Sequence, residues 1–263
     1  MSALQVFVDG VGVWSPQLAD FASLRSVLEG QSPEPPARRP AAATLPANER
    51  RRAPESVLLA VEVAGQAIAM SGQDAASVAC VFASSHGDQA ITDYMCATLA
   101  SAPTELSPIR FHNSVHNAAV GYWTIATGCH APSTAIAAQR ASFGAGLLEA
   151  ASQACAEQRP VLLVCSDFTG TGPLLEVTGC AQTFGCALLL SPQQSGRSIA
   201  RLRLTLTSTR PCSTLGQPLA DWCEANPSAA ALPLLALLAQ GAGSCQLDAA
   251  AQLGLQIDME PVI

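Results

Sequence analysis

A serine, a histidine and an aspartate lie together where one expected strand ends. Residues 84–88 read Ser-Ser-His-Gly-Asp and follow the apolar stretch 76–83. Ligands of α/β proteins bind at the carboxyl ends of strands, so His86 is a candidate base. Ser85 and His86 do not make a triad, because Asp88 alone does not orient the imidazole. We therefore expect an ordinary turn at this place.

Ten cysteines supply candidate thiol nucleophiles. Cys180 and Cys186 are the best placed of them, but no histidine near them in the sequence could activate a thiolate. No two cysteines have Cys-x-x-Cys spacing, and His112 and His130 have no second ligand at a useful spacing, so we expect no metal site. The cysteines are expected to be small buried side chains in a reducing compartment.

The stretch 129–150 reads CHAPSTAIAAQRASFGAGLLEA. A short apolar strand, 132–138, is predicted to run into a helix of small residues, 140–155. The turn between these two elements holds Ala138 and Gln139. Neither side chain is a nucleophile.

Helices and strands are expected to alternate along the chain. Periodicity predicts further helices over 19–28, 54–71, 91–100, 113–127 and 218–239, and apolar stretches predict further strands over 6–13, 76–83, 161–165, 184–190, 200–207 and 253–257. Strands that alternate with helices of ten residues or more indicate βαβ units and a largely parallel sheet. The fully apolar strands at 77 and 161 suit a sheet that is covered on both faces.

The length of 263 residues suits one domain, 1–263, with a substantial core. Residues 31–54 contain six prolines and five arginines without apolar periodicity, so we expect a long loop there. The chain is 49% hydrophobic and only 13% charged, which indicates a surface that is buried against a partner.

Several classes of function are excluded or disfavoured. A net charge of −7 argues against a nucleic-acid partner, and the absence of lysine excludes a Schiff-base or P-loop lysine. No apolar run is long enough for a membrane span, and the N-terminus has no basic region typical of a signal peptide. We expect a cytoplasmic protein without a membrane span.

The order of these elements and their residues resembles the N-terminal half of a β-ketoacyl synthase. Residues 6–16 (VFVDGVGVWSP) resemble the family's opening strand V-x-V-T-G-x-G-x-x-[ST]-P, and Asn113 to Asn117 with Gly121 resembles its helix that begins at an asparagine. Residues 131–134 (APST) resemble the G-P-S entry to the nucleophile strand, and 185–190 (GCALLL) resembles the strand G-A-G-x-L-V-L that closes the half. The common order and spacing of these matches carries the resemblance.

The resemblance implies an α/β, thiolase-like half-fold. Its sheet would be mixed, mostly parallel and five-stranded, covered by helices and truncated relative to a full ketosynthase. Residues 1–190 would form the ketosynthase-like half, and 191–263 would be a short C-terminal extension, too short for a second half.

The chain departs from the family at its catalytic points. In an active ketosynthase the strand ends in T-A-C-S-S, and the cysteine lies at a helix N-terminus whose dipole favours a thiolate. Here that position holds Gln139 or, with a one-residue shift, Ala138, and no histidine follows His130. A glutamine at this position is typical of the partner subunit called the chain-length factor or ketosynthase β, whose short versions are found in aryl polyene pigment clusters.

A silent subunit of this kind would pair with a full-length ketosynthase and would form a homodimer if alone. It would bind no cofactor and would meet the acyl carrier protein indirectly, although the arginine run 50–52 could dock an acidic carrier or be a solvated loop. The resemblance implies a gate loop around 166–184 with Phe184 and Gly185. It also implies a set of interface or tunnel residues: Asn113, His116, Asn117, Gly121, Trp123, Pro132, Ser133, Thr134 and Phe143.

Two alternatives remain open from the sequence. The chain could be a stand-alone acyl-thioester enzyme with a relocated nucleophile such as Cys180 or Ser166, or a structural homodimer without a ligand. A partly buried, satisfied histidine is the alternative for His116.

Overall fold

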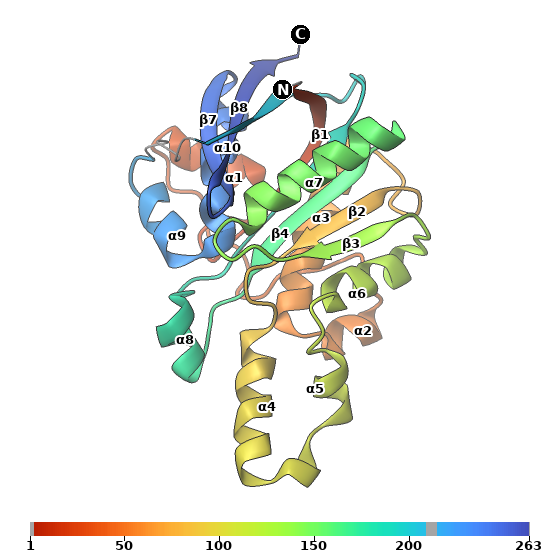
Figure 1. The fold of residues 1–263 in the computed structure, drawn as a ribbon, viewed down its shortest axis with the longest axis vertical. Coiled ribbons are helices and arrows are strands. Elements are labelled where there is room, and N and C mark those ends of the chain that lie inside the picture. The colour runs from red at the N-terminus through yellow and green to blue at the C-terminus, as the bar shows by residue number, and fades with distance from the viewer. Residues whose placement is uncertain (1–2, 209–214, 263) are drawn as a thin grey trace.

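The computed structural model describes residues 3–208 and 215–262, and within them eight strands form one sheet (Figure 1). Their order across the sheet is β3-β2-β4-β5-β1-β6-β8-β7. The strands are β1 (Leu4–Trp14), β2 (Ala79–Ala83), β3 (Ser133–Ile136), β4 (Val161–Asp167), β5 (Phe184–Ser191), β6 (Ala200–Thr207), β7 (Gly243–Ala250) and β8 (Leu253–Pro261). The five strands expected for the half-fold are the adjacent set β3-β2-β4-β5-β1.

The expectation of a mostly parallel, five-stranded sheet is wrong. Strand β2 pairs in parallel with β3 and β4, whereas the other five neighbouring pairs are antiparallel. Parallel neighbours need a crossover of a dozen residues or more. Residues 251–252 alone join β7 to β8, so these strands can pair only in antiparallel fashion.

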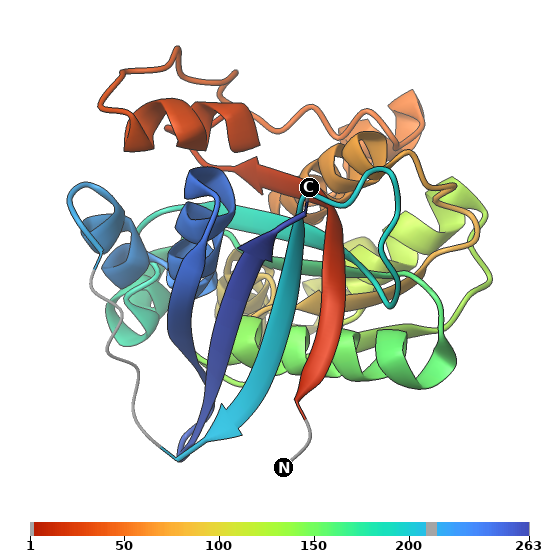
Figure 2. The same ribbon diagram turned by 90° about the horizontal axis from the view of Figure 1, so that it is seen from above.

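Helices cover both faces of the central strands (Figure 2). The α-helices are α1 (Phe21–Leu28), α2 (Ala47–Arg52), α3 (Glu55–Ser71), α4 (Gln89–Ser101), α5 (Pro108–His112), α6 (Ala118–Thr127), α7 (Ser142–Glu157), α8 (Gly172–Thr178), α9 (Leu219–Ala225) and α10 (Leu232–Gln240). Short 3-10 helices occupy Pro103–Glu105 (η1) and Pro227–Ala231 (η2). None of the helices in the described ranges is both long enough and apolar enough to cross a membrane.

The alternation of side chains divides the core into two layers. Leu163 of β4 faces a cluster that includes α1, α7 and α10, whereas the adjacent Leu162 faces a cluster with α3 and α6. Successive residues of a strand point to opposite faces of the sheet, so a central strand covered on both sides must be apolar throughout. This explains the unbroken apolar sequence of β4.

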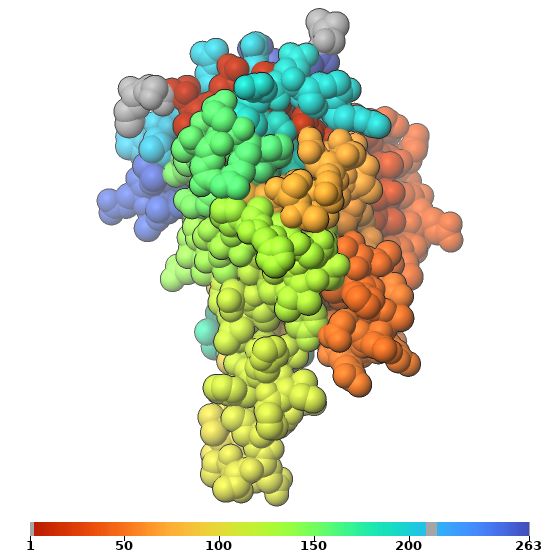
Figure 3. Space-filling model, turned by 90° about the vertical axis from the view of Figure 1, so that its right-hand side faces the viewer, coloured from red at the N-terminus to blue at the C-terminus, as the bar shows by residue number. Residues whose placement is uncertain are grey.

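Two sequence expectations change at the periphery. The stretch 31–54, expected as a loop, contains the short helix α2, and the helix expected over 113–127 begins at Ala118. Between β2 and α6, helices α4 and α5 project from the sheet as an arm (Figures 1 and 3). Of the thirteen residues of α4, Gln89 and Ile91 are buried, so the arm has little contact with the body.

The hairpin β7–β8 packs closely on the first turn of α7. A Cβ atom added at Gly144 would overlap the carbonyl oxygen of Asp248. Backbone can approach backbone this closely because the side chain is missing. The hairpin therefore forms a cover for α7, whose Phe143 and Leu147 are fully buried.

The first prediction concerns this contact. Gly144→Ala is expected to lower the free energy of unfolding by roughly 1–3 kcal/mol, because the methyl group has no room beneath the hairpin. The measurement is urea denaturation of the isolated chain.

Gly121→Ala is the matched control for helical glycines. A Cβ atom at Gly121 meets nothing within 4 Å. This variant is expected to gain up to about 1 kcal/mol from the better helix propensity of alanine. Equal stability changes in the two variants would contradict the packing assigned to Gly144.

Candidate functional site: the turn before helix α7

The turn between β3 and α7 has a strained and well-anchored backbone. Gln139 has a φ of 52°, in the left-handed region. Ser142 Oγ accepts the N–H of Ala138 at 2.9 Å and donates to the carbonyl oxygen of Gln139 at 2.6 Å. Ser85 Oγ donates to the same carbonyl at 2.6 Å. A non-glycine residue at positive φ costs on the order of 1–2 kcal/mol, and these hydrogen bonds offset that cost.

The Gln139 side chain is exposed at the tip of this turn, beside a cavity of about 410 Å³. Small side chains line the cavity together with Gln139, Arg140 and Asp248. The Arg140 guanidinium donates to the carbonyl oxygens of Cys223 and Glu224, so it fixes α9 to the turn. A primary amide can donate and accept hydrogen bonds but does not attack a thioester. Gln139 can therefore position a group but cannot form an acyl-enzyme.

A buried carboxylate lies behind the turn. Asp167, at the end of β4, is 1% exposed. Its Oδ1 accepts from Ser84 Oγ at 2.8 Å and from the N–H groups of Ser85 and His86 at 2.9 and 3.1 Å. Its Oδ2 accepts from Ser228 Oγ at 2.6 Å.

The donors around Asp167 come from two segments far apart in the sequence. They belong to the loop after β2 and to η2, and the fully buried Asn226 adds a hydrogen bond to the Asp167 carbonyl oxygen at 2.8 Å. Both carboxylate oxygens are thus occupied by protein donors. The group holds three segments together and has no free position from which to act as a base.

The candidate thiols are buried and protonated at neutral pH. Loss of solvent raises the pKa of Cys180 to about 12, and Asp167 adds to the shift. Burial also raises the pKa of Cys186 well above its usual value. A reactive cysteine needs a lowered pKa and access to solvent, and neither of these two has them.

His116 contacts the loop after β2. The Nε2 atom of His116 is 3.1 Å from the carbonyl oxygen of Ser84, which satisfies one ring nitrogen. The described residues contain no group of three or more His, Cys, Asp or Glu side chains that could hold a metal ion.

Several residues implied by the resemblance lie at the open edge of the sheet or near it. Pro132 and Ser133 are exposed at β3, the end strand of the sheet that the described residues form, and Thr134 is half-buried there. Asn117 is exposed just before α6, whereas Asn113 is buried and accepts a hydrogen bond from Tyr122 Oη at 3.3 Å.

Other implied residues lie inside the chain. Trp123 and Phe143 are 1% and 0% exposed and belong to the core. Phe184 and Gly185 are not in a loop, which corrects that expectation: they begin β5 and pair with Asp167 and Ser166 of β4. The segment that does leave the sheet is 168–183, which carries α8.

The face next to β3 carries large apolar side chains that the sequence analysis missed. Phe111, Val115 and Ile125 are 57%, 51% and 83% exposed. They line a groove of about 690 Å³ between residues 45–49 and helices α5 and α6. Gly121 and Ile125 are one helical turn apart, so they lie on the same side of α6. This spacing was the feature of the sequence from which an exposed apolar face could have been predicted.

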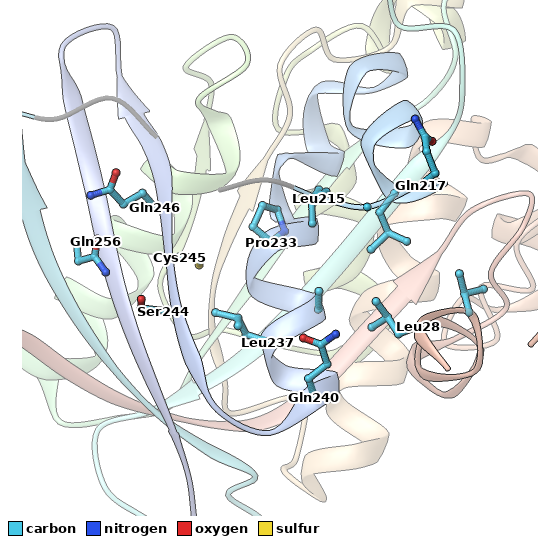
Figure 4. A pocket seen from close by; sticks show the side chains of 14 residues that line it. Leu28, Leu215, Gln217, Pro233, Leu237, Gln240, Ser244, Cys245, Gln246 and Gln256 are labelled. Atoms are coloured by element: carbon cyan, nitrogen blue, oxygen red, sulfur yellow. The ribbon is translucent and has the colours of Figure 1, made fainter. Parts of the chain in front are cut away.

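A second cavity, of about 740 Å³, lies between α1, α10 and the hairpin β7–β8 (Figure 4). Leucine and glutamine side chains line it, including Leu28, Leu237, Gln217 and Gln240. Its titratable lining residue, Cys245, has its pKa raised to about 12 by burial. This lining is suited to contact and not to acid–base chemistry.

A family model and several solved structures are similar to this chain. Residues 26–252 match the family model described as β-ketoacyl synthase, N-terminal domain. No curated protein sequence matches the chain.

Among solved structures, a ketosynthase (ApeO) in complex with its chain length factor (ApeC) from Xenorhabdus doucetiae is similar, with a TM-score of 0.73 and 23% identity over 97% of this chain and 99% of that chain. A β-ketoacyl synthase from Burkholderia phymatum has a TM-score of 0.62 and 14% identity over 91% of this chain and 70% of its own. The ishigamide ketosynthase/chain length factor has a TM-score of 0.57 and 18% identity over 77% and 67%.

The second prediction concerns Asp167. Asp167→Ala leaves several buried donors without an acceptor and is expected to lower the free energy of unfolding by roughly 3 kcal/mol or more. Asp221→Ala is the control, because the exposed Asp221 accepts, within the described ranges, from Gln217 and its loss should cost less than about 0.5 kcal/mol. Denaturation curves of the two variants measure this difference in stability. Similar midpoints would contradict the role given to Asp167.

The third prediction concerns thiol reactivity. A brief exposure to iodoacetamide at pH 7.5 is expected to alkylate the exposed Cys96 well before the buried Cys180, whose raised pKa keeps it as a thiol. Peptide mass mapping over time measures both sites. Faster labelling of Cys180 would contradict the assignment and would favour a relocated nucleophile.

Proposed function

This chain belongs to the β-ketoacyl synthase family, because residues 26–252 match the N-terminal domain of that family, and we propose that it is a catalytically silent subunit of the chain-length-factor type. It would pair with a complete ketosynthase in polyketide or fatty-acid-like chain building. The observation that carries the proposal is the turn before α7, which has an anchored backbone and holds Ala138 and Gln139, neither of them a nucleophile. The resemblance puts the cysteine of an active member at one of these two positions.

The lengths of the similar structures support this assignment. The alignment covers 99% of a chain in the complex of ApeO with its chain length factor ApeC, but 70% of the Burkholderia β-ketoacyl synthase. A chain of matching size therefore occurs in an assembly of a ketosynthase and a chain length factor. Short partners of this size suit the aryl polyene setting, which we include in the proposal.

The open edge of the sheet supports pairing through β3. The carbonyl oxygens of Pro132 and Ile136 accept from β2, so alternation turns the N–H and C=O groups of Ser133 and Ala135 away from β2, toward the open edge. An unpaired edge is a template for a strand of another chain. We propose that the partner ketosynthase covers this edge, and that a second copy covers it when the partner is absent.

The side chains that this chain contributes, and those it lacks, define the tasks of the two proposed subunits. The partner would supply the thiolate and the histidines for condensation, and it would meet the carrier protein that delivers the acyl group. This chain would supply walls of the chamber in which the product grows. Gln139, fixed in position by the Ser85 and Ser142 hydrogen bonds, would be part of that wall.

The fourth prediction tests pairing and silence together. Co-expression with the ketosynthase encoded nearest to this chain is expected to give a tight one-to-one complex by size exclusion. A carrier-protein elongation assay should show turnover with both chains and none with this chain alone. Elongation of an acyl thioester by the isolated chain would refute the proposal.

An edge-strand variant gives this experiment a structural control. Ala135→Pro removes one outward N–H group and leaves the hydrogen bonds to β2, so the fold should persist while the complex weakens. Ala135→Val keeps the N–H group and should pair like the unmodified chain. Equal complex formation by both variants would exclude β3 as the paired edge.

A further inference from the structure

Strand β7 ends the sheet on the side opposite to β3. Within the described ranges β8 pairs with it on one side and no strand pairs with it on the other. Side chains of consecutive strand residues point to opposite faces. The cavity of about 740 Å³ is lined by Ser244, Cys245 and Gln246 together, so it reaches around the edge of β7 (Figure 4). The cavity is therefore a groove along this edge, where a strand presents alternate N–H and C=O groups.

The two sides of this groove differ in their chemistry. On the core side, α1 and α10 contribute Leu28 and Leu237, next to the buried Cys245. On the other face of the hairpin, Gln246 of β7 and Gln256 of β8 lie directly opposite each other. None of the described residues that line the groove is charged. Because a charge that loses water without a counter-charge is costly, the groove favours an uncharged occupant.

The part of the edge beside the groove lacks the features that keep edge strands from pairing. Natural sheets protect their edges with charged side chains, prolines or bulges. Residues 243–247 (GSCQL) contain no charge and no proline, and their pairing with β8 is regular. The charged Asp248 and the register shift between Asp248 and Ala250 follow directly. Pairing is therefore open along the groove and obstructed beyond it.

Other elements flank the edge of β7 and restrict what can reach it. The exposed Gln217, before α9, and the exposed Gln240, at the end of α10, line the groove together with β7. If β7 of a second copy approached about a two-fold axis, these flanking residues of both copies would meet before the edges came within the roughly 4.8 Å of paired strands. A single extended segment carries no such flanks. The groove therefore suits one peptide strand and not the edge of a second sheet.

We propose that the groove binds one extended, uncharged peptide segment of another protein, which adds to the sheet as a further strand beside β7. Its side chains would alternate, with apolar ones toward Leu28 and Leu237 and small polar ones toward Gln256. In this mode of recognition backbone hydrogen bonds supply affinity, and the sites for alternate side chains supply specificity. Strands β7 and β3 lie at opposite ends of the sheet, so the proposal goes beyond the proposed function and does not depend on it.

The fifth prediction compares two fluorescent, acetylated and amidated peptides of equal composition. One alternates leucine with threonine over about seven residues, which matches the length of a strand such as β7, and the other has its leucines grouped. Fluorescence anisotropy is expected to show at least tenfold tighter binding of the alternating peptide to the isolated chain, because the grouped peptide turns leucines toward the glutamines. Hydrogen exchange should slow at amides within 243–247. Equal affinity of the two peptides, or no binding of either, would overturn the proposal.

Two variants fill the groove from different elements. Ser244→Trp on β7 and Gln240→Trp on α10 change exposed side chains that line it, so both should keep the fold, which circular dichroism checks. Each is expected to weaken binding of the alternating peptide at least tenfold. Ser101→Trp is the matched control, since Ser101 is exposed on α4 and does not line the groove, and it should bind within a factor of about three of the unmodified chain. Unchanged affinity in both groove variants would overturn the proposal.

A second copy of the chain is the competing occupant, and sedimentation of the isolated chain tests for it. A homodimer that Ser244→Trp disrupts would overturn the peptide as the occupant, because β7 would then pair with another copy. Pairing with the ketosynthase is measured separately, and Ser244→Trp is expected to form that complex like the unmodified chain. Failure of the ketosynthase complex would therefore leave the peptide assay unaffected, and failure of the peptide assay would leave the pairing at β3 intact.

Discussion

The buried carboxylate of Asp167 sets the geometry around the end of the sheet. A charge that is 1% exposed is costly unless donors replace water, and here the donors are Ser84, Ser85, His86 and Ser228. They belong to segments up to 144 positions apart, from 84 to 228. The need to solvate one anion therefore fixes the loop after β2 and the turn at η2 relative to β4.

The turn before α7 depends on this arrangement. Asp167 holds the backbone of Ser85, and Ser85 in turn donates to the carbonyl oxygen of Gln139, whose positive φ would otherwise be unfavourable. Strained turns persist where the surrounding structure holds them. The fold needs the turn whatever its chemistry, because the turn starts α7 and lines the cavity beside Arg140.

Local patterns predicted the elements better than the pairing between them. The helix predicted over 54–71 is confirmed as α3, and its left-handed cap at Gly72 explains where it stops. The direction of the strands was missed, since antiparallel pairing of β1 with β5 and β6 joins residues nearly 200 positions apart. The exposure of Ile125 was not predicted either. The sequence alone does not show whether an apolar residue of a helix packs in the core or lies at the surface.

Helices α7 and α6 differ in how far the chain itself covers them. The hairpin covers α7 so closely that Gly144 cannot carry a side chain, which completes one layer of the core from within the chain. Nothing in the described chain does the same for the edge of β3 or for Ile125. A chain that is 49% hydrophobic and 13% charged has few charged residues for such a face. The proposed second subunit would account for both the low charge content and the open edge, because it would complete the sheet at β3.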